Sequence, residues 1–257
     1  MNNNPIGVFD SGIGGINVLK SLVKKFPNED FIYVADTLNC PYGTKSKEEI
    51  KNLVDRVSNY LINKKCKAIV IACNTATANA NHLFELDDIA VLGVILPTAN
   101  EALKNSKKVA VLATDATINS GIYQEVLLNA KKEVYPVKCS LFVEPIEKGE
   151  CGTKENYELV SKHLNHLKDK NIDTVILGCT HFALISNEVK KVFPKANLIN
   201  SGEPTSEELY KILEKRNLLS SNKKGKVYLK TTFAANALMN QIKIFNLKYE
   251  YIEKIII

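Results

Sequence analysis

The chain has 257 residues, of which 45% are hydrophobic and 24% charged, so it has the composition of a globular protein and enough length for one large domain or two smaller ones. Its net charge is +6, but Lys and Arg are scattered and Trp is absent, which argues against a nucleic-acid-binding surface. No apolar run approaches the roughly 18 residues that cross a bilayer, and the N-terminus lacks signal-peptide features. We therefore expect a cytoplasmic protein that binds neither nucleic acid nor membrane.

Short β-branched apolar runs alternate with helix-length amphipathic segments along the chain. Strands are predicted at residues 6–10, 31–36, 68–72, 109–114, 133–137, 174–178, 197–200 and 227–232, with a final one at 252–257. Helices are predicted at residues 15–25, 46–64, 155–170 and 205–215. Ser46 and Glu49 form a capping-box pattern at the start of the second helix. The alternation favours an α/β fold with parallel sheets covered by helices on both faces.

Two places along the chain combine turn residues with a proline, and no low-complexity linker divides it elsewhere. The stretch LPTAN (96–100) follows a strand-like run, and NSGEP (200–204) follows the predicted strand at 197–200. We expect the chain to cross between two domains at these two points.

Two predicted strands end in a cysteine that is followed by hydroxyl, amide or imidazole side chains: IVIACNTAT (69–77) and VILGCTHFA (175–183). Ligands bind at the carboxyl ends of strands in parallel sheets. Cys73 and Cys179 would each lie at the start of a helix, where N–H groups and the helix dipole lower a thiol pKa. A single free cysteine is more often a buried apolar side chain, but two cysteines in matched settings favour a functional pair.

A pair of thiols permits two chemistries. Sulfurs in contact would form a redox disulfide, whereas sulfurs on opposite sides of a substrate carbon would act as acid and base and invert that carbon. Reversible inversion needs two near-equivalent sites, which explains the repeated pattern. General acid–base catalysis supplies roughly 10²–10⁴-fold, so positioning and electrostatic stabilisation must supply the rest.

Asp10 and His181 are the nearest candidates to assist the thiols. Asp10 ends the first strand and His181 follows Cys179 by two positions, so either could orient a thiol or relay its proton. Asp10 could instead be a helix N-cap, and His181 a structural histidine. DSGIGG (10–15) lacks the third glycine of a dinucleotide fingerprint and is not followed by a P-loop Lys. The cysteines include no CxxC pair and no lysine marks a pyridoxal phosphate site, so we expect no metal and no cofactor.

Five segments in order resemble bacterial glutamate racemase: DSGIGG (10–15), ADTLNCPYG (35–43), ACNTATA (72–78), LATDATINSGIY (112–123) and LGCTHFALI (177–185). The resemblance implies a cofactor-independent isomerase that interconverts L- and D-glutamate through two cysteines and supplies D-glutamate for peptidoglycan. It also implies two similar α/β domains related by a pseudo-twofold axis, with the active site between them. The first domain would comprise residues 1–97 plus 206–257 and the second residues 98–205. A homodimer is a further expectation from the family.

Carried over by motif, the catalytic residues are Cys73, Cys179, Asp10, His181 and Glu147. The substrate contacts implied are Asp10, Ser11, Tyr42, Gly43, Asn74, Thr75, Thr180 and His181. FVEPIE (142–147) departs from the family because its proline comes one residue later, which affects the assignment of Glu147. Cys40 falls in a substrate-side loop without a matching partner, and the remaining cysteines are assigned to packing: Cys66, Cys139 and Cys151.

Three other functions stay open at this point. A racemase for aspartate or another amino acid would use the same two thiols. A thiol–disulfide oxidoreductase would instead form a Cys73–Cys179 bond readily on oxidation. A binding module for acidic amino acids would bind its ligand without bringing solvent deuterium to the α-carbon.

Overall fold

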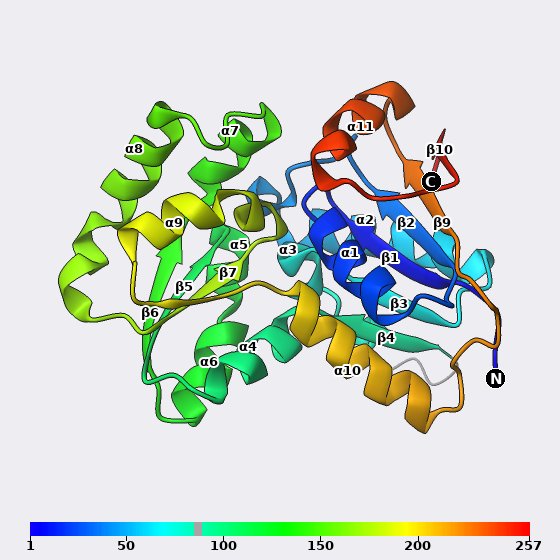
Figure 1. Cartoon of the computed structure of the whole chain (residues 1–257), viewed down its shortest axis with the longest axis horizontal. Coiled ribbons are helices and arrows are strands. Elements are labelled where there is room, and N and C mark those ends of the chain that lie inside the picture. The colour runs from blue at the N-terminus through cyan, green and yellow to red at the C-terminus, as the bar shows by residue number, and fades with distance from the viewer. Residues whose placement is uncertain (85–88) are drawn as a thin grey trace.

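The computed structural model describes residues 1–84 and 89–257 as an α/β fold with two parallel sheets, each with helices on both faces (Figure 1). The first sheet has the strand order β10-β9-β2-β1-β3-β4. Its strands are β1 (Ile6–Asp10), β2 (Phe31–Ala35), β3 (Ala68–Ile71), β4 (Ala90–Gly93), β9 (Val227–Thr231) and β10 (Tyr251–Lys254). The second sheet has the order β6-β5-β7-β8. Its strands are β5 (Lys108–Ala113), β6 (Glu133–Lys138), β7 (Thr174–Gly178) and β8 (Asn197–Ile199). The predicted α/β class with parallel sheets is confirmed.

Alternate side chains of the strands enter hydrophobic clusters on opposite faces of each sheet. In β1, Ile6 and Val8 pack on one face and Phe9 on the other. The face with Ile6 and Val8 is covered by α1 (Ile16–Lys25), α10 (Gly202–Lys215) and α11 (Ala235–Ile242). The face with Phe9 is covered by α2 (Lys47–Asn63) and α3 (Asn74–Thr77). The second sheet is covered by α4 (Ile95–Leu103), α5 (Asp115–Ser120) and α6 (Ile122–Asn129), and on its other face by α7 (Val143–Glu147), α8 (Lys154–Leu164) and α9 (Ser186–Val192). Each sheet is therefore doubly covered.

The two sheets repeat one strand order. In β2-β1-β3-β4 and in β6-β5-β7-β8, the first strand of the set lies between the second and the third, and the fourth lies outside the third. Cys73 follows β3 and Cys179 follows β7, the third strand of each set. The repeated cysteine pattern therefore reflects a repeated topology. After the second sheet, β9 and β10 return to extend the first sheet beyond β2.

Helices occupy much of the two predicted crossing points: LPTAN (96–100) lies within α4, and the last three residues of NSGEP (200–204) begin α10. Pro97 lies in the first turn of α4, and Pro204 in the first turn of α10. A proline is tolerated there because the N–H groups of a helix's first turn have no intrahelical acceptor. The helix predicted at 205–215 accordingly begins at Gly202. The exact domain boundaries stay a prediction, and residues 85–88 of the expected first domain lie outside the described residues.

Other element boundaries differ by smaller amounts. The strand-like run before residue 96 ends at Gly93, where α4 soon begins. The helix predicted at 155–170 becomes α8 followed by a 3₁₀ helix, Asn165–Lys170. The capping box is confirmed, because Ser46 Oγ accepts from Glu49 N–H and the Glu49 carboxylate accepts from Ser46 N–H.

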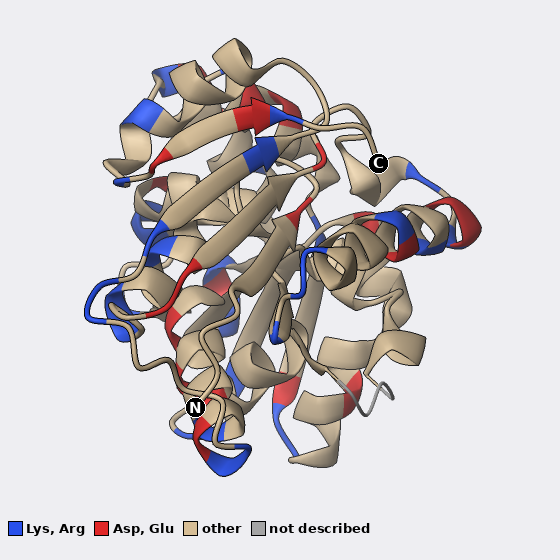
Figure 2. Cartoon of the chain, turned by 90° about the vertical axis from the view of Figure 1, so that its right-hand side faces the viewer, with Lys and Arg blue, Asp and Glu red and all other residues tan. Residues whose placement is uncertain are grey.

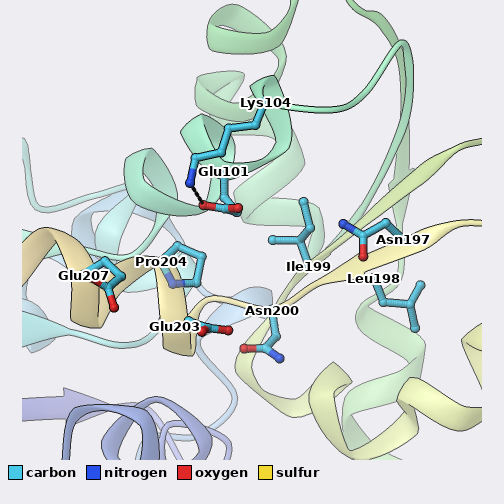
Figure 3. A pocket seen from close by; sticks show the side chains of 9 residues that line it. All are labelled: Glu101, Lys104, Asn197, Leu198, Ile199, Asn200, Glu203, Pro204 and Glu207. Atoms are coloured by element: carbon cyan, nitrogen blue, oxygen red, sulfur yellow. Dashed lines mark hydrogen bonds and ion pairs between the residues drawn. The ribbon is translucent and has the colours of Figure 1, made fainter. Parts of the chain in front are cut away.

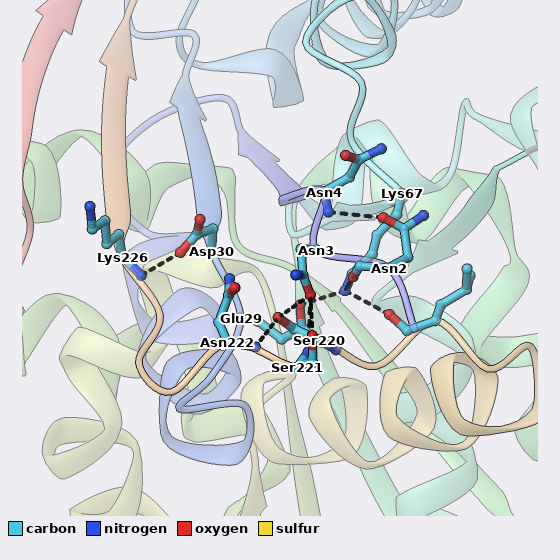
Figure 4. Close-up of polar contacts among 11 residues, drawn as sticks. Asn2, Asn3, Asn4, Glu29, Asp30, Lys67, Ser220, Ser221, Asn222 and Lys226 are labelled. Carbon is cyan, nitrogen blue, oxygen red and sulfur yellow. Dashed lines mark hydrogen bonds and ion pairs between the residues drawn. The ribbon is translucent and has the colours of Figure 1, made fainter.

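A buried ion pair fastens the end of the first sheet opposite the cysteines (Figure 4). The Lys67 and Glu29 side chains are 0% and 3% exposed, and Nζ lies 2.6 Å from Oε2. Lys67 Nζ also donates to the carbonyls of Asn2 and Leu218, at 2.5 and 2.6 Å. Glu29 Oε1 accepts from Ser220 N–H at 2.7 Å. The pair therefore joins the N-terminus, the approach to β2, the approach to β3 and the segment after α10.

The surface charges are mixed. On the face that Figure 2 shows, Lys and Arg are interleaved with Asp and Glu over the strands and helices. Within the described parts of the chain, every helix is too short or too polar to cross a membrane.

Candidate active site

A narrow cavity lies where the carboxyl ends of the strands of both sheets meet. Its volume is about 10 Å³, roughly the room of one water molecule, so an amino acid can enter only when the cavity widens. Both cysteines line it, together with Ser11, Pro41, Tyr42, Gly43, Asn74, Thr75, Thr114, Val143, Thr180 and His181. These residues come from segments that follow β1, β2, β3, β5, β6 and β7. The cavity is therefore built from both halves of the fold.

Cys73 is a buried thiol at the N-terminus of α3. Its Sγ accepts from Ala76 N–H at 3.4 Å and lies 3.6 Å from Ser11 Oγ. Burial, together with the nearby charge of Asp10, raises the pKa of Cys73 to about 12, although both hydrogen bonds act in the opposite direction. The expectation of a lowered pKa is therefore wrong for Cys73, because α3 has only four residues and its dipole cannot offset burial. At neutral pH Cys73 carries its proton.

Cys179 lies in a different electrostatic setting. It ends β7 and precedes a 3₁₀ helix, Thr180–Ile185, and its Sγ is 3.7 Å from His181 Nδ1. His181 Nε2 is 2.5 Å from Glu147 Oε1. Burial by itself lowers the pKa of His181, but the hydrogen bonds and charges of Cys179 and Glu147 together raise it well above its ordinary value. Cys179 therefore faces a protonated imidazole at neutral pH.

Glu147 completes this arrangement from α7. Burial raises the pKa of its carboxyl, but the hydrogen bond and charge of His181 outweigh burial and leave the pKa lowered. Its Oε2 also accepts from Gln241 Nε2 of α11 at 3.3 Å. Glu147 does not line the cavity; it acts on Cys179 only through His181.

Asp10 bridges the two halves of the fold beneath the cavity. Its Oδ1 accepts from Gly12 N–H at 3.0 Å and its Oδ2 from Thr180 Oγ1 at 3.1 Å. Complete burial raises the pKa of Asp10, against the lowering effect of the His181 charge. The alternative role as an N-cap is wrong, because α1 begins at Ile16 with Gly15 as its N-cap.

Every expected substrate contact except Asp10 lines the cavity. The polar atoms of three of them form hydrogen bonds with other side chains around the cavity. Tyr42 OH donates to Asp36 Oδ2 at 2.6 Å, and Thr75 Oγ1 is 2.9 Å from Thr114 Oγ1. Asn74 Oδ1 accepts from Tyr123 OH at 2.7 Å. Its buried Nδ2 has no protein partner among the described residues and is available to a ligand.

Glycine at position 14 permits the two halves to approach closely. A Cβ there would lie 2.7 Å from the carbonyl carbon of Thr180 and 2.7 Å from His181 N. Any larger residue would push the loop after β1 away from the loop after β7. The DSGIGG segment therefore serves close packing beside Cys179.

Three lining residues were not assigned from the sequence: Pro41, Thr114 and Val143. Thr114 could have been found, because it directly follows β5 as Ser11 follows β1 in the repeated strand order. The rule that picked out the cysteines applies to it equally. Val143 and Gln241 carry no comparable signal, because only the folded chain brings α7 and α11 to the site.

A wider depression lies between α4, β8 and α10 (Figure 3). Its volume is about 440 Å³, and its charged lining residues are Glu101, Lys104, Glu203 and Glu207. It contains none of the expected residues and no thiol. The smaller cavity is the candidate active site, because the two cysteines that the sequence predicts as acid and base line it.

The family model that matches residues 6–205 is described as Asp/Glu/Hydantoin racemase. The chain belongs to this family and is an isomerase of the amino-acid racemase class. It is 37% identical to the glutamate racemase of Bacillus cereus over 98% of each chain. It is 40% identical to that of Listeria monocytogenes over 84% of each.

Solved structures agree with this assignment. Glutamate racemase of Bacillus anthracis superposes with a TM-score of 0.94 at 32% identity, covering 100% of this chain and 99% of that one. That of Francisella tularensis, solved in complex with D-glutamate, gives 0.93 at 34% identity, covering 100% and 98%. Aspartate racemase of Picrophilus torridus gives 0.62 at 20% identity over 84% of this chain and 99% of that one, a likeness of fold alone.

Replacing Asp10 or His181 by Asn is expected to slow turnover by about 10²-fold, the lower range for a group that assists proton transfer. Asp10 acts mainly on Cys73 and His181 on Cys179, so kcat should fall unequally in the two directions. The equilibrium constant between enantiomers is one, so kcat/KM must stay equal in the two directions. In the direction where kcat falls more, KM must therefore fall more as well. Initial rates from each enantiomer measure this. The exposed His166→Asn serves as control, and wild-type kcat in both directions would remove the two residues from the mechanism.

Proposed function

We propose that the chain interconverts L-glutamate and D-glutamate by a two-base mechanism without a cofactor, with Cys73 and Cys179 as its acid and base. The observation that carries this is the placement of both thiols on one narrow cavity, each at the end of the third strand of its own sheet. We also propose that the product supplies peptidoglycan synthesis, that the protein is a cytoplasmic homodimer, and that its domains comprise residues 1–97 plus 206–257 and 98–205.

The different settings of the two cysteines suggest how a cycle begins. Cys179 Sγ lies 3.7 Å from Nδ1 of His181, and we assign Cys179 as the base that first removes the α-proton. Cys73 keeps its proton and donates it to the opposite face of the carbanion-like intermediate. For the reverse reaction the two thiols exchange roles.

The walls of the cavity offer groups for a dicarboxylic amino acid. The hydroxyls of Ser11 and Thr75 and the free Asn74 Nδ2 are donors for the two carboxylates, whereas the Thr180 hydroxyl already donates to Asp10. Oxygen acceptors of the same walls can hold the ammonium group. Closing these donors around the substrate excludes water and strengthens their interaction with charge that develops at the reacting carbon.

The test is to incubate the purified protein with L-glutamate in D₂O without any added cofactor. D-glutamate should accumulate to an equal mixture and carry deuterium at its α-carbon, as measured by chiral chromatography and mass spectrometry. L-aspartate treated in the same way is the control for substrate choice. Inversion of aspartate in preference to glutamate would support the alternative racemase, and binding without deuterium incorporation would support a binding module.

A further inference from the structure

Three side chains of types that can ligate a metal lie together at the edge of the cavity, which His181 lines: Cys40, Glu147 and His181. Their ligand atoms all lie within 4.8 Å of one another. Glu147 Oε1 is at the centre, 3.9 Å from Cys40 Sγ and 2.5 Å from His181 Nε2. The mechanism above uses the histidine and the carboxylate but gives Cys40 no part.

The three ligand types are those that Zn²⁺ prefers. Thiolate, imidazole and carboxylate bind Zn²⁺ at about 2.0–2.3 Å in tetrahedral geometry, which places the ligand atoms roughly 3–4 Å apart. The triad reaches this spacing if side chains move by about 1 Å. The Glu147 side chain is 25% exposed, which gives an ion a route from solvent.

Two neighbouring features keep the triad together. A Cβ at Gly12 would lie 2.8 Å from Glu147 Oε1, 3.1 Å from Cys40 Sγ and 3.4 Å from His181 Nε2. A side chain at this position would therefore collide with the ligand atoms, and glycine leaves room for them. Gln241 holds the other carboxylate oxygen of Glu147. Metal-binding residues are commonly fixed in this way by outer contacts.

We propose that Cys40, Glu147 and His181 form a Zn²⁺ site whose occupancy inhibits the enzyme, an inference that rests on the proposed racemase function for its effect but not for the binding itself. Binding places the metal on Nε2 of His181 and on Sγ of Cys40, and the protons that these two atoms carried pass to the solvent. The imidazole is then neutral, keeps its single N–H toward Cys179 and loses its contact with the Glu147 carboxylate. It no longer places a positive charge beside Cys179, so turnover falls in both directions.

The spacing of the ligands explains why the sequence analysis expected no metal. Cys40 and Glu147 are 107 positions apart, and Glu147 and His181 are 34 apart. They come from the loop after β2, from α7 and from the 3₁₀ helix after β7. Sequence patterns for zinc rest on ligands a few residues apart, so only the fold brings this set together.

Binding is tested first without reference to activity, with Co²⁺ as a spectroscopic substitute for Zn²⁺. The wild-type protein should give the near-ultraviolet thiolate-to-cobalt absorption of a tetrahedral site, and one equivalent of Zn²⁺ should remove it. Cys40→Ser should lose this absorption. Cys151→Ser, a half-buried thiol elsewhere, and Cys73→Ala, which lacks a cavity thiol, should both retain it.

Inhibition is tested next by titrating Zn²⁺ into the racemase assay. Cys40→Ser should keep wild-type turnover in the absence of metal and need at least about 10-fold more Zn²⁺ for half inhibition. Equal inhibition and equal cobalt absorption in wild type and Cys40→Ser would assign the metal to the cavity cysteines and overturn the proposal. Absence of cobalt absorption with normal racemisation overturns the metal site alone, whereas absorption without racemisation overturns the proposed function alone.

Discussion

Replacing Cys73 or Cys179 with alanine is expected to abolish racemisation in both directions while the protein stays folded. Each thiol serves one face of the α-carbon, so loss of either leaves a proton that cannot be removed or cannot be returned. General acid–base catalysis of this kind contributes about 10²–10⁴-fold, and the expected loss is at least that large. Chiral chromatography of product from each enantiomer measures the effect, and circular dichroism checks the fold.

The matched control is Cys66→Ala. Cys66 is also buried and packs in the cluster between the first sheet and α2, but it does not line the cavity. It should retain wild-type turnover, since the substitution removes a thiol of the same kind from a site without access to substrate. Full activity of either cavity variant would refute a two-thiol mechanism.

Replacing Lys67 with methionine is expected to lower the free energy of unfolding by about 3–5 kcal/mol, the cost of leaving a buried charge without its partner. The Glu29 carboxylate would then remain 3% exposed without its cation. For a chain of this size the melting temperature should fall by roughly 6–20 °C. Urea unfolding at neutral pH and calorimetry measure the two quantities.

Two further variants separate the ion pair from a general effect of the substitution. Lys51→Met, on the exposed face of α2, should change stability by less than about 0.5 kcal/mol. Combining Glu29→Gln with Lys67→Met should cost clearly less than the sum of the single changes, because the partners are coupled. Additive losses would show that the pair does not act as a unit.

The strands and the thiol pair could be predicted because their signals are local. A β-branched run such as residues 174–178 becomes a strand in almost any α/β context, and its carboxyl end is where a ligand site forms. The starts of α4 and α10 could not be located as well. A proline breaks a helix when it lies in the interior but is accepted in the first turn. The sequence around Pro97 or Pro204 therefore does not distinguish a loop from the start of a helix.

The electrostatics of the site could not be read from the sequence. The position of Cys73 before α3 indicated a lowered pKa, whereas the folded chain buries the thiol near Asp10 and raises it. The pKa of His181 depends on Glu147, a residue 34 positions away. The burial and the charge that a side chain experiences depend on all of its neighbours in the folded chain. Most of these neighbours are distant in sequence, so a local sequence pattern does not reveal them.

The return of β9 and β10 to the first sheet sets an order for folding during synthesis. The second sheet uses one continuous stretch, residues 108–199, and can complete its pairing on a nascent chain. β2 has no neighbour on its outer side until Val227–Thr231 has left the ribosome. A chain truncated before that point would present a bare sheet edge, the feature that most readily recruits other chains into aggregates.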